Sequence, residues 1–245
     1  FYPGDDVARS PVAGEVLETQ TVRCPPKPYA VDEDYLILLD CGDVVARILH
    51  VEPAVSAGDS VGVGDSIGTL VRSGFFGQWV DNHIHLGFRT HDQNLRRASG
   101  SMPLELDVTV TGLPWDGTGT VVEMGPTHVR LDAPTADEDG FTALASDDGT
   151  PIDGGLRHYA GGGALTATDG TVLLLGTTIG ETSGRELRWD DVAIYANDDR
   201  ATGLSLFASQ VAFGAKLVFH EGHDFAVGDS VSISVKPTET PIRLG

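Results

Sequence analysis

Short apolar runs separated by glycine, proline and aspartate recur along the whole chain, and helical periodicity is nearly absent. The run at 34–40 is apolar throughout its interior, and a tight turn at 41–43 connects it to a second apolar run at 44–51. This pattern predicts a β-hairpin. A third run, at 80–88, reads as a further strand, whereas only 91–99 suggests one or two helical turns. The chain is therefore predicted to be all-β.

A short motif occurs three times. Gly-Asp-Ser followed by valine or isoleucine stands at 58–61, at 64–67 and again at 228–231. Gly-Asp is typical of a turn, and the branched residue after the serine favours the start of a strand. Similar β-turn units are therefore expected near both ends of the chain.

The second half of the chain changes character after Gly100. Residues 104–111 alternate apolar and polar positions with period two, and further short strand candidates follow, separated by Gly, Asp and Asn. We predict two domains, 1–103 and 104–245. The second is expected to be a β sandwich or barrel, with its last strands packing on the first domain.

Composition excludes several classes of partner. Thirty-six acidic residues against 16 Lys and Arg give a formal net charge of −20. That field repels nucleic acid and anionic membrane surfaces, and no apolar window is long enough for membrane insertion. Lysine occurs at three positions only, and this depletion together with the spread of aspartate favours a halophilic source. The first residues carry no signal-peptide pattern, so the cytoplasm is the default expectation.

The candidate chemistry lies in the run at 80–88. His83 and His85 are two residues apart and would share one face of a strand. If the run at 44–51 belongs to the same sheet, His50 can lie close to both. Three neighbouring imidazoles suit Zn²⁺. The alternative is a half-exposed strand that carries unrelated polar residues.

Several motifs in order resemble one known family. Ser10–Val16 is similar to the A-P-x-x-G-x-V segment of lysostaphin-type (LytM-like) zinc endopeptidases, Val55–Gly68 resembles their paired glycine turns, and Asn82–Leu86 falls on P-H-L-H-F. The resemblance covers residues 9–89 and implies a duplicated hybrid motif fold for the first domain. It further implies that His85 binds zinc, and that the substrate is a peptide or cell-envelope polymer.

The same resemblance implies that His50 and His83 are the general acid/base and oxyanion-stabilising pair. The family's remaining ligands come from an upstream H-x-G-x-D motif, which is missing before Ser10. His220–Asp224 matches that motif letter for letter, so a circularly permuted arrangement would supply His220 and Asp224 as metal ligands. The alternatives are a chance hairpin turn at this place, and a catalytically degenerate relative that binds a protein partner or has a structural role.

A second resemblance leads to another class. Ile84–Phe88 is similar to the I-H-I-G-I motif of glucose-type IIA histidine phosphocarriers. In that case His50 and His85 would handle a phosphoryl group. The threonine and lysine surroundings of that family are missing, and the charge of −20 disfavours phosphoryl groups.

Overall fold

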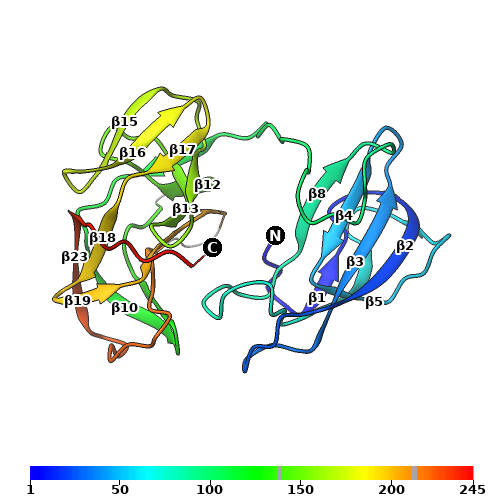
Figure 1. The fold of residues 1–245 in the computed structure, drawn as a ribbon, viewed down its shortest axis with the longest axis horizontal. Coiled ribbons are helices and arrows are strands. Elements are labelled where there is room, and N and C mark those ends of the chain that lie inside the picture. Colours follow the sequence, from blue (N-terminus) through cyan, green and yellow to red (C-terminus); the bar gives the residue numbers. More distant parts are fainter. Residues whose placement is uncertain (137–139, 211–213, 245) are drawn as a thin grey trace. The chain divides into compact units, whose positions relative to one another are not determined.

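The computed structural model describes residues 1–136, 140–210 and 214–244. None of these residues is helical, so the described chain consists of strands, turns and loops. It forms two compact units, Phe1–Glu105 and Leu106–Gly245 (Figure 1). The all-β prediction is confirmed. Among the described residues there is also no helix that is long and apolar enough to span a membrane.

Two antiparallel sheets form the first unit. One has five strands in the order β6-β2-β3-β4-β8, and the other has three in the order β1-β7-β5. The predicted hairpin is present as the pair β3–β4. The strands are β1 (Val7–Arg9), β2 (Gly14–Arg23), β3 (Glu33–Asp40), β4 (Val45–Leu49), β5 (Val51–Pro53), β6 (Ser60–Val61), β7 (Ser66–Leu70) and β8 (His85–Arg89).

Strand β3 is buried on both faces, which explains its continuous apolar run. Leu36 and Leu38 belong to a small cluster on one face, whereas Ile37 and Leu39 belong to the main core on the other. This alternation follows from the period of two in a strand. The main core joins the two sheets, and its buried members are Ala8, Val16, Ile37, Leu39, Ala46, Ile48, Val51, Val61, Ile67, Leu70 and Ile84.

The three Gly-Asp turns have the same construction. The glycine before each aspartate has a φ of +93°, +87° or +98°, a conformation that favours glycine. Asp59, Asp65 and Asp229 each accept a hydrogen bond from the backbone N–H three residues upstream, at 2.8, 2.7 and 2.8 Å. The strands β6, β7 and β23 (Ser230–Pro237) begin directly after them. The repeated motif thus builds one turn type in both units.

The second unit has one core lined by β-strands. Its large sheet runs in the order β15-β16-β17-β14-β13-β20-β22-β11-β10-β23-β18-β19, and a small sheet has the order β21-β12-β9. Besides β23, the strands are β9 (Val110–Leu113), β10 (Thr118–Gly125), β11 (His128–Leu131), β12 (Phe141–Leu144), β13 (Ile152–Leu156), β14 (Gly161–Ala164), β15 (Gly170–Leu174), β16 (Thr177–Ser183), β17 (Glu186–Trp189), β18 (Val192–Ala196), β19 (Asp199–Ala201), β20 (Gly203–Leu206), β21 (Ala208–Ser209) and β22 (Lys216–Val218).

Three local predictions were wrong. The single strand expected at 44–51 is interrupted at His50, whose φ is +69°. Residues 91–99 form turns and no helix, and the Arg89 guanidinium donates hydrogen bonds to the carbonyls of Asn94, Arg97 and Ser99 in this segment. The alternating segment 104–111 becomes a strand only from Val110, and its earlier apolar side chains are exposed.

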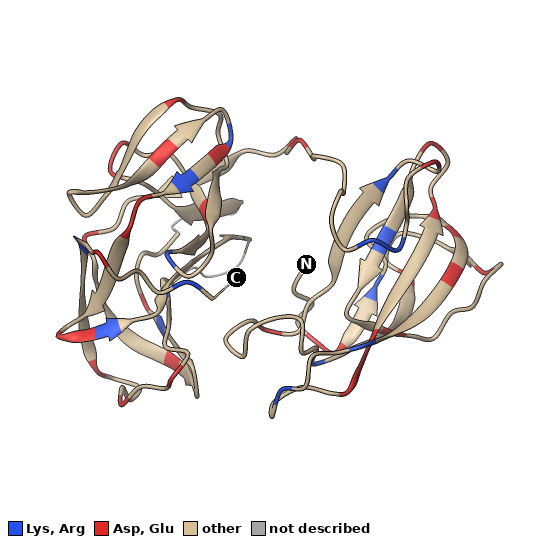
Figure 2. Cartoon of the chain, in the orientation of Figure 1, with Lys and Arg blue, Asp and Glu red and all other residues tan. Residues whose placement is uncertain are grey.

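Acidic residues are distributed over strands and loops of both units and are not gathered in a single tail (Figure 2). Two arginines of the first unit differ from this exposed charge. Arg47 and Arg89 are 3% and 2% exposed, and both donate to backbone carbonyls in the segment after β8. Buried cations therefore hold that segment against the sheet that carries the histidines.

Candidate metal centre

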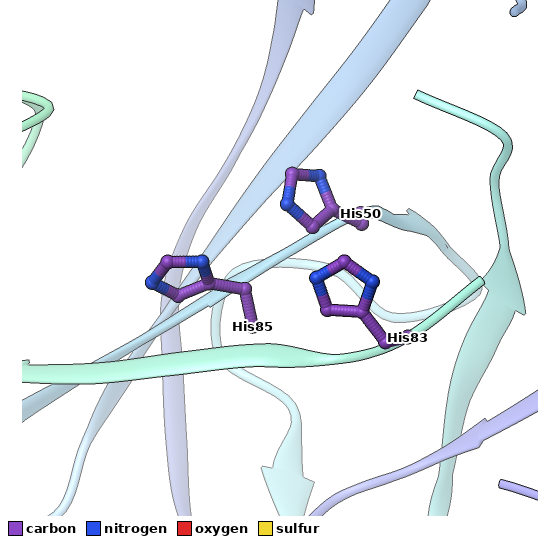
Figure 3. A group of neighbouring side chains, drawn as sticks. All are labelled: His50, His83 and His85. Carbon is purple, nitrogen blue, oxygen red and sulfur yellow. The ribbon is translucent and has the colours of Figure 1, made fainter. Parts of the chain in front are cut away.

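The register between β4 and β8 brings the three predicted histidines together. Leu49 pairs with His85, so His50, the residue after Leu49, lies next to the beginning of β8. His83 precedes β8 by two residues and lies on the same side of the chain as His85. Figure 3 shows the three side chains converging from these two segments. The predicted proximity of His50 to both other histidines is thus found in the structure.

The three imidazoles form a compact group. One ligand atom from each of His50, His83 and His85 lies within 4.8 Å of the others. The ring centre of His50 is 5.0 Å from that of His83 and 5.9 Å from that of His85. His50 is buried, His83 is half-buried and His85 is exposed. The group therefore has one member that is buried in the protein, His50, and one that is accessible to solvent, His85.

Asp34, at the start of β3, is the direct partner of His50. The Nδ1 atom of His50 lies 2.6 Å from Oδ2 of Asp34, and both side chains are almost completely buried. The hydroxyl of Ser73 donates to the same Oδ2 at 2.6 Å. Although burial alone would raise it, the hydrogen bonds from His50 and Ser73 hold the pKa of Asp34 below its usual range. Asp34 is therefore a carboxylate, and Nε2 is the nitrogen of His50 left for a ligand.

His83 is oriented by the backbone. Its Nδ1 lies 2.9 Å from the carbonyl oxygen of Asp81, and since a carbonyl only accepts, Nδ1 carries the proton. Nε2 of His83 is again the nitrogen that a metal could use. Two of the three histidines thus have one nitrogen fixed as a donor, the arrangement usual for metal-binding imidazoles.

The environment of His83 and His85 favours their neutral forms. Burial, and then the nearby His50, lowers the pKa of His83 to about 4. Although His85 as a whole residue is exposed, desolvation of its ring lowers its pKa, followed by the charges of His50 and Arg47. Metal ions bind the neutral form of imidazole, so these shifts favour metal binding over protonation at neutral pH.

The donor set fits a zinc ion. Nitrogen ligands lie about 2.0–2.1 Å from zinc, so two of them in a tetrahedral site are about 3.3–3.4 Å apart. Side-chain adjustments that close at most about 1.5 Å between two rings would bring the observed group, with its 4.8 Å limit, to that spacing. Three protein nitrogens would leave one tetrahedral position for a water molecule or a substrate, and His85 is the exposed member of the group.

An aromatic loop, residues 73–82, borders the cluster. The ring of Phe76 lies 5.0 Å from that of His50 and 4.8 Å from that of His83. Arg72 fixes the loop, because its guanidinium donates to the carbonyls of Gly77 and Gln78 and also to that of Val80. The site therefore has a well-anchored apolar wall on one side.

Sequence reasoning missed Asp34 and Ser73 as parts of the site. Asp34 was visible as an acid at the head of an apolar strand, and a buried carboxylate there requires a partner. Ser73 carried no comparable signal, since its contact with Asp34 spans 39 positions in the sequence.

The other two predicted ligands belong to the second unit. Nδ1 of His220 lies 2.7 Å from Oγ1 of Thr202, and Asp224 is exposed in the segment before the third Gly-Asp turn. Within the described residues, the group able to hold a metal contains neither His220 nor Asp224. The permuted arrangement stays a prediction.

Fold and site define a two-unit all-β protein with a three-histidine cluster in its first unit. The chain belongs to the DUF8155 family: its residues 1–106 match the model described as the N-terminal domain of the domain of unknown function DUF8155, and residues 111–236 match the corresponding C-terminal domain. No curated protein and no solved structure gives a significant match.

Proposed function

We propose that the first unit is a zinc-dependent hydrolase that cleaves an amide bond in a peptide or cell-envelope polymer. The observation that carries this proposal is the convergence of His50, His83 and His85, with one ligand atom of each within 4.8 Å of the others. The resemblance of residues 9–89 to lysostaphin-type endopeptidases supports the same reaction class.

The number of ligands favours a catalytic over a purely structural metal. Structural zinc sites are usually closed by four protein ligands, whereas this group offers three and is open beside His85. The lowered pKa values of His83 and His85 favour metal binding in either case, because metal ions bind neutral imidazole. Zinc bound here would supply a Lewis acid for the amide carbonyl and an activated water. The protein's part is to hold the nitrogens in place and to line the site with Phe76.

The resemblance and the geometry differ over the role of two residues. The family pattern makes His85 the ligand and gives His50 and His83 acid/base roles. The close spacing and the fixed Nδ1 donors favour His50 and His83 as ligands as well, with Nε2 directed to the metal. We therefore propose that all three bind one zinc ion.

Metal analysis of protein purified without chelator tests the proposal. The wild type should carry one zinc per chain, and His50→Ala, His83→Ala and His85→Ala should each lose most of it. His91→Ala is the matched control, because His91 is exposed and bonds the Gly42 carbonyl away from the cluster. Absence of zinc from every wild-type preparation, including zinc-supplemented ones, would contradict the proposal.

Hydrolysis is tested separately on the zinc-loaded protein. Incubation with a mixed peptide library, followed by mass spectrometry, should reveal new termini that are absent with His85→Ala. Stoichiometric zinc without any cleavage would favour the alternative of a degenerate binding module for a protein partner. A phosphohistidine on His50 or His85 would instead favour the phosphocarrier class.

A further inference from the structure

We propose that Asp34 and Ser73 are positioning residues of the histidine cluster. Asp34 holds His50 in the tautomer in which Nδ1 carries the proton and Nε2 has a free lone pair. Ser73 in turn holds the carboxylate of Asp34 in place. The consequence for zinc affinity rests on the proposed function, whereas the tautomer of His50 does not depend on it.

The surroundings of Asp34 leave its carboxylate no freedom. The residue is 1% exposed. Its Oδ1 accepts the backbone N–H groups of Tyr35 at 2.7 Å and of His50 at 3.1 Å. Its Oδ2 accepts His50 Nδ1 and the Ser73 hydroxyl, both at 2.6 Å. A buried carboxylate is costly unless its oxygens are satisfied, and here both oxygens are.

Ser73 connects this carboxylate to the aromatic loop. Its side chain is fully buried, and while its hydroxyl donates to Asp34 it accepts the backbone N–H of Phe75 at 3.2 Å. The same loop contributes Phe76 to the wall of the site and ends at His83. One hydroxyl thus joins the support of His50 to the segment that carries the second histidine.

The tautomer follows from the hydrogen-bond inventory. An ionised carboxylate accepts only, so the short contact requires a proton on Nδ1 of His50. In neutral imidazole, Nε2 is then unprotonated and can bind a metal. Hydrogen bonding of this kind sets both the tautomer and the ring orientation of metal-binding histidines.

Asp34→Asn tests this relationship with almost no change of shape. The two backbone N–H groups hold the amide oxygen at the Oδ1 position, which places the amide NH₂ opposite His50 Nδ1. Two donors cannot face each other, so the proton of His50 should move to Nε2 and block the ligand position.

The first measurement uses the full-length, metal-free protein at pH 8. We expect ¹⁵N NMR of the imidazoles to show His50 as the Nδ1–H tautomer in the wild type and as the Nε2–H tautomer in Asp34→Asn. Asp43→Asn, at an exposed hairpin turn, is the matched control and should resemble the wild type. A wild-type Nε2–H tautomer, or an unchanged tautomer in Asp34→Asn, would overturn the proposal.

The second measurement is zinc affinity by competition with a chromophoric chelator. Asp34→Asn should lower the affinity about 10–100-fold, the usual effect of losing such a partner. Ser73→Ala should lower it less, and Ser73→Thr, which keeps a hydroxyl, should restore it. Ser60→Ala, at the exposed first position of β6, serves as control. Wild-type affinity in Ser73→Ala would overturn the role of Ser73.

The two measurements separate the two proposals. If the wild type binds no zinc, the proposed function fails, and the tautomer measurement still decides the role of Asp34. Circular dichroism identifies variants that do not fold. If Asp34→Asn does not fold, the tautomer of His50 in the wild type still tests the role of Asp34. The zinc affinities of Ser73→Ala and Ser73→Thr then test the role of Ser73.

Discussion

Leu49 and His85 lie opposite each other in the register of β4 and β8. This pairing brings together two parts of the site that are remote in sequence, because His50 follows Leu49 and His83 precedes His85. His50 leaves the strand with a φ of +69°, a conformation uncommon for residues other than glycine. Such local strain is found where the surrounding structure enforces it, often at functional sites.

Substitution of two glycines in the repeated turn region by alanine should lower the free energy of unfolding by different amounts. At Gly68 an added Cβ would lie 1.9 Å from the carbonyl oxygen of Glu52, whereas at Gly64 nothing lies within 4 Å. Gly64→Ala should cost about 1 kcal/mol through its positive φ alone. Gly68→Ala should cost about 3 kcal/mol or more, because β5 and β7 must separate. Urea unfolding of both variants measures the difference, and equal costs would contradict it.

His158 predicts acid sensitivity of the second unit. The residue is 1% exposed, and burial lowers its pKa to about 4. In the unfolded chain His158 takes up a proton near pH 6.5, whereas in the folded chain it does so only near pH 4. The contribution of neutral His158 to the free energy of unfolding is therefore fully present above pH 6.5 and declines as the pH falls toward 4. Between pH 7.5 and pH 5 the free energy of unfolding should fall by about 2 kcal/mol from this group.

The measurement is urea unfolding at pH 7.5 and pH 5, followed by tryptophan fluorescence. His158→Gln removes the titrating group and should show a smaller loss over this interval. The comparison is between slopes, since the substitution also changes packing at both pH values. A variant with the same pH dependence as the wild type would show that other groups cause it.

The parts of the site that depend on local strand geometry could be predicted from the sequence, whereas those that depend on contacts between remote residues could not. The shared face of His83 and His85 follows from strand geometry, and the proximity of His50 follows once the run at 44–51 is placed in the same sheet as the run at 80–88, as β4 and β8 are. The break at His50 and the Ser73–Asp34 contact depend on long-range packing. Likewise, the apolar alternation before Val110 looked like a strand, but a strand needs a neighbour that the sequence does not reveal.

The charge of −20 predicts salt-dependent stability, in line with our proposal of a halophilic source. Exposed acids repel one another, and the screening length falls from about 10 Å at 0.1 M salt to about 3 Å at 1 M. The melting temperature should therefore rise by several degrees between 0.1 and 2 M, equally in NaCl and KCl. Circular dichroism measures this. A melting temperature independent of salt would contradict both the repulsion argument and the halophilic proposal.

The three-histidine proposal also predicts that zinc survives removal of the H-x-G-x-D match in the second unit. His220 is hydrogen-bonded to Thr202, and the group of described residues that could hold a metal contains neither His220 nor Asp224. The double variant His220→Ala/Asp224→Ala should keep one zinc per chain by elemental analysis, with unchanged chelator competition. His83→Ala, measured in parallel, should lose it. Loss of zinc in the double variant would instead support the permuted motif, since the second unit would then contribute ligands to the site.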